Sequence, residues 1–554
     1  MKKHLLRKIL LNVVMGGALL LPNLPATGVE AADFKYKVDD GPEQTWDGSA
    51  DLRGTGSKLE VWGEGAVSSN MIYGGYDSGP IIISGKTVVF KNGEVVRVYG
   101  GYSWDDGDAI ENTVTISGGS VGVVYGGYSW DGNITENAVS ISGGSVGRDV
   151  CGGRSTYGNV TENAVSISGG SVGGDVYGGN SDYGDATENT VTVSGGSVEG
   201  YIYGGKSYSD ADIDADITGN IVNISGGSVN GVYGGNSSNG NVTENAVNIS
   251  GGTAGGEVSA GFSWYGDATG NTVTISGGMV NTVYGGRSIY GNVTENTVSI
   301  SGGSVGWDVY GGSSEWGGKV NGNTVIISDG TVGEYVSGGF SYGGEVSGNK
   351  VIISGGDLSN AEVYGYGGSP SSHSNNTLQI NNPVTIKKVA KFDIIDLCNT
   401  GSVTIKDLTV ERSSILKVDG RKITSAAAIS GLTSATVKSG AKLYVSNAVK
   451  NTEYKILAGS GLNVQSWTDD STMGDGFRAS YGLLVDTDNI VNNGSEFSIR
   501  FKEDPLATSN LDIRNIVTNL PAESKAKEWL DAVSVNQSGT DALKNTINTM
   551  ANVS

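Results

Sequence analysis

Proline, cysteine and histidine are almost absent from this chain. Of its 554 residues, 8 are Pro, 2 are Cys and 2 are His. No proline occurs between Pro80 and Pro370, and a proline inside a ladder of strands would delete a hydrogen bond. So few cysteines and histidines exclude a zinc site of the usual ligand types. We expect Cys151 and Cys398 to be free thiols, because the repeat described below separates them by more than the ~7 Å that a disulfide allows between Cα atoms.

Positive charge is also scarce. The chain has 36 Lys and Arg against 58 Asp and Glu, a net charge of −22. A nucleic-acid partner is therefore not expected, because phosphate binding needs a basic surface. Gly is abundant at 91 residues, but it does not fall at every third position, which excludes collagen.

One line of sequence returns for most of the chain. A slot of the Tyr-Gly-Gly type recurs at steps of 25 to 30 residues, most often 26, and begins at Tyr73, Tyr99, Tyr125, Cys151, Tyr177, Tyr203, Tyr233, Ser259, Tyr284, Tyr310, Ser337 and Tyr364. A fixed period in this range is typical of a solenoid, a propeller or a repeat array. A propeller blade needs about 40 residues and four longer strands, so the period favours a solenoid.

Apolar and polar residues alternate within each repeat. Val114 and Ile116 point to one side and Thr115 and Ser117 to the other, as in a strand with one buried face. The sequence predicts an all-β protein, a right-handed parallel β-helix with about twelve coils of ~26 residues over 61–377. We expect a cap at 32–60, an irregular β-stem that caps the other end at 378–504, and a short helical linker at 505–554.

Equivalent residues of successive coils should stack in columns. One such column is predicted to be a ladder of hydrogen-bonded asparagines, at Asn112, Asn137, Asn163, Asn189, Asn220, Asn245, Asn271, Asn296, Asn323 and Asn349. Val176 is expected in a buried column, where an Asp would be costly. Tyr177 is expected in an outward column that tolerates substitution, because Ser259 and Ser337 already occupy its slot.

The N-terminus has the pattern of a secretory signal. Lys2, Lys3, Arg7 and Lys8 precede an apolar stretch from Ile9 to Leu21, and small residues at Val29 and Ala31 suit cleavage after Ala31. The apolar stretch is shorter than the ~20 residues of a membrane span. We therefore expect residues 1–31 to be a signal peptide that exports the chain through the Sec pathway.

The repeats NTVTISGG and VYGGYS resemble the passenger of a bacterial autotransporter, a type V secretion protein. The segment at 378–504 is similar to the C-terminal cap of such passengers, and 505–554 is similar to the linker before the translocating barrel. The resemblance implies an adhesin at the surface or outer membrane of a Gram-negative envelope, or secreted from it. It also implies an outer-membrane translocator barrel as partner, either in a longer form of this chain or encoded separately.

Two sets of residues are candidates for binding. Exposed aromatic residues recur in the outward column and in the turn that follows it, and the contact candidates are Tyr125, Trp130, Tyr177, Tyr183, Trp264, Tyr284, Tyr310 and Trp316. Stacked rings also stabilise neighbouring coils, so the aromatic rows have a structural role as well as a role in binding. The acidic loop with Asp210, Asp212, Asp214 and Asp216 is a weak calcium candidate through its oxygen ligands, and otherwise a solvated loop.

These observations favour a non-enzymatic surface protein, an adhesin or a structural component of the cell surface. We expect no cofactor and no catalytic residue, and the partner to be a glycan or protein on a host or bacterial surface. The alternative is a carbohydrate-active lyase or hydrolase, because β-helices also host such enzymes and these use clustered carboxylates. The repeated turn carboxylates do not mark a unique site, since a catalytic site normally breaks a repeat once.

Overall fold

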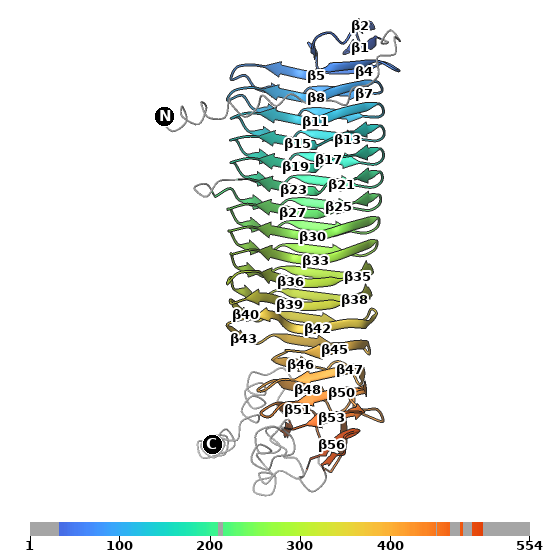
Figure 1. Cartoon of the computed structure of the whole chain (residues 1–554), viewed down its shortest axis with the longest axis vertical. Coiled ribbons are helices and arrows are strands. Elements are labelled where there is room, and N and C mark those ends of the chain that lie inside the picture. Colours follow the sequence, from blue (N-terminus) through green and yellow to red (C-terminus); the bar gives the residue numbers. More distant parts are fainter. Residues whose placement is uncertain (1–32, 209–213, 450, 466–476, 480–489, 502–554) are drawn as a thin grey trace, which may run out of the picture.

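The structure, a computed structural model, describes residues 33–208, 214–449, 451–465, 477–479 and 490–501. Its described residues form strands, turns and bends without a helix, so they include no helix that could cross a membrane. Parallel coils stack along the long axis of the molecule, from β5 near one end toward β56 near the other (Figure 1). The predicted parallel β-helix is confirmed. The predicted signal peptide and helical linker lie outside the described residues.

Each repeat coil contributes a strand to each of three columns (Figure 1). The core strands are β4 (Lys58–Trp62), β7 (Thr87–Phe90), β10 (Thr113–Ile116), β13 (Ala138–Ile141), β17 (Ala164–Ile167), β21 (Thr190–Val193), β25 (Ile221–Ile224), β29 (Ala246–Ile249), β32 (Thr272–Ile275), β35 (Thr297–Val305), β38 (Thr324–Val332) and β41 (Lys350–Ile353).

The tyrosine strands carry the Tyr-Gly-Gly slot. They are β5 (Val67–Asp77), β8 (Glu94–Ser103), β11 (Ser120–Ser129), β15 (Val150–Ser155), β19 (Val176–Ser181), β23 (Ile202–Ser207), β27 (Val232–Ser237), β30 (Thr253–Ser263), β33 (Met279–Ser288), β36 (Asp308–Ser314), β39 (Tyr335–Tyr342) and β42 (Leu358–Ser369). The short strands β14 (Ser145–Val146), β18 (Ser171–Val172), β22 (Ser197–Val198) and β26 (Ser228–Val229) lie between the first two columns.

The edge strands form a separate sheet of 12 short strands, in agreement with the predicted number of repeat coils. They are β6 (Ile83–Ser84), β9 (Ala109–Ile110), β12 (Ile134–Thr135), β16 (Val160–Thr161), β20 (Ala186–Thr187), β24 (Ile217–Thr218), β28 (Val242–Thr243), β31 (Ala268–Thr269), β34 (Val293–Thr294), β37 (Val320–Asn321), β40 (Glu345–Ser347) and β43 (Ser372–Ser374).

Pairing between coils follows the sequence repeat. Val150 lies between Val124 and Val176, and Cys151 lies between Tyr125 and Tyr177. Val176 is fully buried in the main core, as predicted. The valines and isoleucines of the core and tyrosine strands thus stack into one main core, while those of the edge strands form smaller separate clusters. A shift by one residue would carry the buried side chains to the solvent side.

Buried asparagines link the coils through a second, polar column. The Asn220 Nδ2 group donates to Oδ1 of Asn245 (2.9 Å) and to the backbone carbonyl of Ala186 (2.9 Å), while Oδ1 of Asn220 accepts from the backbone N–H of Asn189 (2.9 Å). The same bonds recur from Asn112 to Asn349, which confirms the predicted ladder. The structure adds Asn376, whose side chain bonds to the Asp393 carboxylate (3.0 Å) and so closes the ladder.

The Tyr-Gly-Gly motif is explained by this ladder. A Cβ atom on Gly205, the second glycine of its pair, would lie 2.6 Å from Nδ2 of Asn220. A Cβ on Gly204 would lie 2.4 Å from the carbonyl oxygen of Gly234 in the next coil. Glycine avoids both close approaches. One coil nevertheless holds Ala260 at the first position of the pair and keeps Gly261 at the second, next to the ladder.

The residue before each ladder asparagine has a left-handed backbone. Four coils use glycine there, at Gly219, Gly270, Gly322 and Gly348, with φ between 64° and 69°. Six coils instead place an exposed glutamate at a φ of 56° to 59°, namely Glu111, Glu136, Glu162, Glu188, Glu244 and Glu295. A left-handed conformation costs a non-glycine residue about 1–2 kcal/mol, so the packing of the ladder overrides local preference.

Stacking continues into the segment that the sequence assigns to a stem. Strand β44 (Thr377–Ile380) pairs in parallel with β41 and with β46 (Ile394–Asp396), and β46 pairs with β48 (Ile415–Asp419). The steps shrink to 17 residues from Thr377 to Ile394 and 21 residues from Ile394 to Ile415. These coils lack an edge strand among the described residues, so the repeat disappears from the sequence although the pairing persists.

The remaining strands after β42 complete this end of the solenoid. Parallel pairs join β45 (Thr385–Ala390), β47 (Val403–Val410), β49 (Ile429–Leu432), β50 (Ser434–Val437), β51 (Lys442–Ser446), β52 (Glu453–Gly459), β53 (Leu462–Val464) and β54 (Phe477–Ala479) to the stack. Strand β56 (Glu496–Arg500) then pairs antiparallel with β52 and with β55 (Val491–Asn492). An antiparallel strand on the last coil covers an edge that would otherwise invite pairing with other chains.

The other end of the solenoid is covered in a similar way. Strand β1 (Phe34–Val38) runs antiparallel to β2 (Gln44–Trp46) and to β4, and β3 (Leu52–Arg53) pairs with β5. The buried Phe34 ring lies 4.9 Å from the Trp46 ring and 6.5 Å from the Phe90 ring, measured between centroids. These strands and rings cover the first repeat coil.

The ladder predicts a strong effect of removing one asparagine. Asn220→Ala leaves the carbonyl of Ala186 and the N–H of Asn189 without their side-chain partners in the interior. We expect a loss of about 2–4 kcal/mol in the free energy of unfolding, measured by urea denaturation. The matched control is Asn248→Ala, an exposed asparagine on the next coil, with an expected change under about 0.5 kcal/mol. Equal losses in the two variants would contradict the role of the ladder.

Candidate ligand-binding face

One side of the solenoid is lined by aromatic rings. This aromatic face consists of the outward side chains of the tyrosine strands and of the turns that follow them. Tyr177 and Tyr203 pack with Cys151 in a cluster that is separate from the main core. The alternation of the tyrosine strands therefore places valines inside and tyrosines outside, as the sequence predicts.

Rings of successive coils stack in the tyrosine column. The ring centroids of Tyr99 and Tyr125 are 5.0 Å apart, those of Tyr177 and Tyr203 are 5.2 Å apart, and those of Tyr284 and Tyr310 are 5.0 Å apart. Cys151 and Ser259 interrupt the column, while Tyr335 bridges the gap at Ser337 by packing on Tyr310 and Tyr364. The stacks hold neighbouring coils together, because each ring covers the face of the next.

The stacking of the tyrosine rings overturns the predicted exposure of one contact candidate. Tyr177 is only 5% exposed, since Tyr203 covers its ring and its hydroxyl donates to Asp175 (2.9 Å). The prediction that Tyr177 is an exposed contact residue is therefore wrong, and a buried ring is no longer expected to tolerate substitution. The outward direction was predicted correctly, but outward side chains of neighbouring coils bury one another.

The other contact candidates differ in exposure. Trp264 and Trp316 are exposed. The half-buried candidates are Tyr125, Trp130, Tyr183, Tyr284 and Tyr310. Most are covered by rings of adjacent coils, as in the pairs Trp104–Trp130 (5.9 Å) and Tyr157–Tyr183 (5.1 Å).

The turn column differs from its sequence prediction at one position. Tyr265, and not Trp264, stacks on Tyr290, with 5.2 Å between ring centroids. Trp264 instead packs edge-on against Phe262. Within the part of the chain that the structure describes, Trp316 makes no ring pair with Tyr290 or Tyr342, the aromatic residues of the adjacent coils. Among the contact candidates, the Trp316 indole is thus the ring whose faces are not covered by the described aromatic residues of the adjacent coils.

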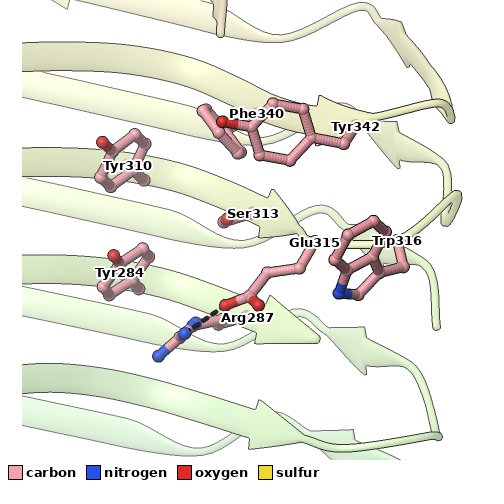
Figure 2. Close-up of a pocket in the computed structure, with 8 residues that line it drawn as sticks. All are labelled: Tyr284, Arg287, Tyr310, Ser313, Glu315, Trp316, Phe340 and Tyr342. Carbon is pink, nitrogen blue, oxygen red and sulfur yellow. Dashed lines mark hydrogen bonds and ion pairs between the residues drawn. The ribbon is translucent and has the colours of Figure 1, made fainter. Parts of the chain in front are cut away.

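Trp316 borders a groove of about 440 Å³ on this face. Figure 2 shows Tyr284 and Tyr310 on successive strands, with Phe340 and Tyr342 on the next coil and Trp316 beside Glu315. The rings of Phe340 and Tyr342 meet at 88°, and Tyr342 is 50% exposed. Arg287 and Ser313 complete the lining. The volume lies within the range of about 300–1,000 Å³ for small-ligand pockets.

An ionic cluster forms the polar part of the groove. The Arg287 guanidinium donates to the Glu257 carboxylate (2.8 Å) and to Glu315, and it lies 5.2 Å from the centroid of the Tyr284 ring. Burial raises the pKa of Glu257 above its ordinary value, against the attraction of Arg287. Burial also lowers the pKa of Arg287, but Glu257 and Glu315 outweigh it and raise that pKa.

The groove therefore has no positive charge to spare. Both ion pairs of Arg287 that the structure shows are with carboxylates. The Tyr284 hydroxyl can donate a hydrogen bond, because a phenol is protonated at neutral pH; burial raises its pKa further, to about 12. The arrangement offers open rings, hydrogen-bond donors and acceptors, and a charge that is neutral or negative.

The acidic loop is only partly described. Asp210 and Asp212 lie outside the described residues, and Asp214 is exposed. Asp216 belongs to a ladder of turn residues: its N–H donates to Asp185 (2.9 Å) and its carboxylate accepts from the N–H of Asn241 (2.8 Å). Asp216 thus has a structural role in the turn, and a calcium site in this loop stays a prediction.

Three carboxylates meet at another turn. Oxygen atoms of Asp105, Asp106 and Asp131 lie within 4.8 Å of one another. Asp105 and Asp131 occupy equivalent places in successive coils, and Tyr157 holds that place in the next coil, so the cluster is confined to two coils. Exposed acidic groups of this kind are common without an ion.

The predicted free thiols are confirmed. Cys151 is buried among the tyrosines and Cys398 is partly buried, and neither forms a disulfide. Burial raises the pKa of each thiol to about 12, which suppresses the reactive thiolate.

Sequence reasoning missed the polar members of the groove. Arg287 follows the Gly-Gly pair of its coil, in the slot that holds Tyr102, Tyr128 and Phe340 in others. Other coils hold Arg154 and Lys206 in the same slot, so the sequence contained no signal that singles out Arg287. Comparison of the chain with protein-family models, with curated proteins and with solved structures gives no match. The proposed function therefore rests on the geometry of the aromatic face and its groove.

The stacked column predicts that Tyr177→Ser is not mild. The variant loses the stacking on Tyr203, the hydrogen bond to Asp175 and the contact with the Lys206 ammonium, 5.4 Å from the ring. We expect a loss of at least about 2 kcal/mol in the free energy of unfolding. Tyr265→Ser, at a ring that is 58% exposed, should lose less than about 1 kcal/mol. Urea denaturation of both variants measures this, and an unchanged Tyr177→Ser protein would refute the buried stack.

Proposed function

We propose that the chain is an exported, non-enzymatic surface protein, the passenger of an autotransporter-like system, which acts as an adhesin. The observation that carries this proposal is the extended aromatic face on a long parallel solenoid. A long stack of coils can present repeated contact surface over a large distance from the cell, as extended solenoids do for their partners.

Three further features support the proposal. The signal-like sequence at 1–31 suits export. Ladders and stacked rings join each coil to the next, so the scaffold needs no disulfide. The net charge of −22 keeps the surface soluble and disfavours nucleic acid. The outer-membrane translocator barrel that the resemblance implies belongs to this proposal as the export partner.

A bead assay tests adhesion directly. Beads coated with the purified chain are counted on a panel of epithelial and bacterial cells, against beads coated with albumin. We expect excess attachment to at least one cell type, and competition by free chain in solution. Attachment no higher than that of albumin on every cell type would refute the adhesin.

A carbohydrate-active enzyme is the second candidate, and the convergence of Asp105, Asp106 and Asp131 favours it. The same preparation is therefore incubated with neutral and acidic polysaccharides, and new reducing ends and unsaturated products are measured. The adhesin proposal predicts neither. Turnover that disappears in Asp131→Asn would establish the enzyme instead.

A further inference from the structure

We infer that the groove at Trp316 binds a segment of an uncharged polysaccharide, a chain of neutral pyranose sugars. This inference rests on the proposed adhesin function and gives its ligand class. The groove differs from the rest of the aromatic face in three respects, each of which points to the chemistry of a neutral sugar.

The first respect is the open ring of Trp316. In three pairs of the turn column, rings of successive coils cover one another: Trp104 with Trp130, Tyr157 with Tyr183, and Tyr265 with Tyr290. Trp316 is 61% exposed and stacks on neither adjacent aromatic residue of the described chain. A pyranose ring presents a flat array of C–H groups that packs on an aromatic face, with its hydroxyls directed to the sides.

The second respect is a second exposed ring nearby. Tyr342 lies one coil beyond Trp316, at the end of β39, and is 50% exposed. Because Ser314 pairs with Ser341, Tyr342 aligns with Glu315 and not with Trp316, so the two rings do not stack on each other. Both therefore stay open to a ligand that has more than one sugar.

The third respect is the polar lining. Glu315 accepts a hydrogen bond from Arg287 with one oxygen, Oε1. Tyr284 also lines the groove, and its hydroxyl is protonated at neutral pH like that of any tyrosine. Groups of both kinds satisfy sugar hydroxyls, which are donors and acceptors at once.

The charge of the groove selects against acidic glycans. Glu257 and Glu315 already neutralise Arg287. A uronate, sialate or sulfate group would meet an acidic protein without an unpaired cation in the described lining. Desolvating such an anion there is unfavourable, so the ligand class is neutral.

The test is titration of the full chain with neutral and anionic oligosaccharides. Glucose hexamers of the β1,4 and α1,4 types and the β1,4 N-acetylglucosamine hexamer are compared with oligogalacturonate and heparin fragments, by calorimetry and tryptophan fluorescence. We expect a neutral hexamer to bind, and Trp316→Ala to weaken it at least about tenfold, as for an aromatic hot spot.

Two matched variants locate the site. Trp307→Ala removes an indole with 53% exposure at the other end of β36, and Trp104→Ala removes one with 54% exposure in the stacked part of the turn column. Neither should change the affinity more than about twofold. Equal weakening by Trp104→Ala would replace the groove with binding along the whole column and overturn the inference.

The remaining outcomes separate this inference from the adhesin proposal. If no neutral hexamer binds, or if an anionic fragment binds more tightly, the glycan inference is wrong. Attachment of beads coated with Trp316→Ala protein then measures adhesion that does not depend on the groove. Adhesion by the wild-type chain without glycan binding would retain the adhesin and discard its sugar ligand, whereas absence of both would discard both.

Discussion

Each buried asparagine joins its own coil to the next through its side-chain amide. Asn220 contacts the backbone of the preceding coil and the side chain of Asn245 in the following one. Because these groups are buried, a break leaves unsatisfied donors and acceptors in the interior. The ladder thus couples every coil to a common register, and the stacked valines and tyrosines follow that register. The glycine pairs are needed because the backbone passes so close to the ladder.

The stacking of equivalent residues on neighbouring coils also explains how a repetitive protein acquires one particular binding site. A repeated side chain is covered by its copies on either side, as Tyr177 is by Tyr203. A binding surface therefore arises where the repeat is interrupted. At the groove, Arg287 and Ser313 stand between Phe262 and Phe340 in their column, and Trp316 is left without a stacked neighbour among the described rings. The proposed adhesin would then use the uniform coils as a scaffold and a local irregularity as its contact site.

The sequence predicted the fold better than the surface. Period, alternation and the asparagine column led to the parallel β-helix, since each depends on contacts between equivalent residues. The exposure of Tyr177 could not be predicted, because it depends on the neighbouring coil covering the ring. The sequence also did not reveal that the segment after Tyr364 continues the coils. Loss of the edge strand shortens the repeat there, although β44 and β46 continue the parallel pairing. Arg287 and Glu315 become partners only through stacking, 28 residues apart in sequence.

The most direct test of the register is deletion of part of the solenoid. Removing residues 138–163 deletes one whole coil, since Asn137 and Asn163 are equivalent positions 26 residues apart. Removing residues 138–150 deletes about half a coil and shifts every later column. Urea denaturation and protease resistance of the two deletions should differ: the whole-coil deletion is predicted to stay folded with a midpoint near that of the full chain, and the half-coil deletion to lose it. A half-coil deletion as stable as the whole-coil deletion would contradict the central role of the ladder.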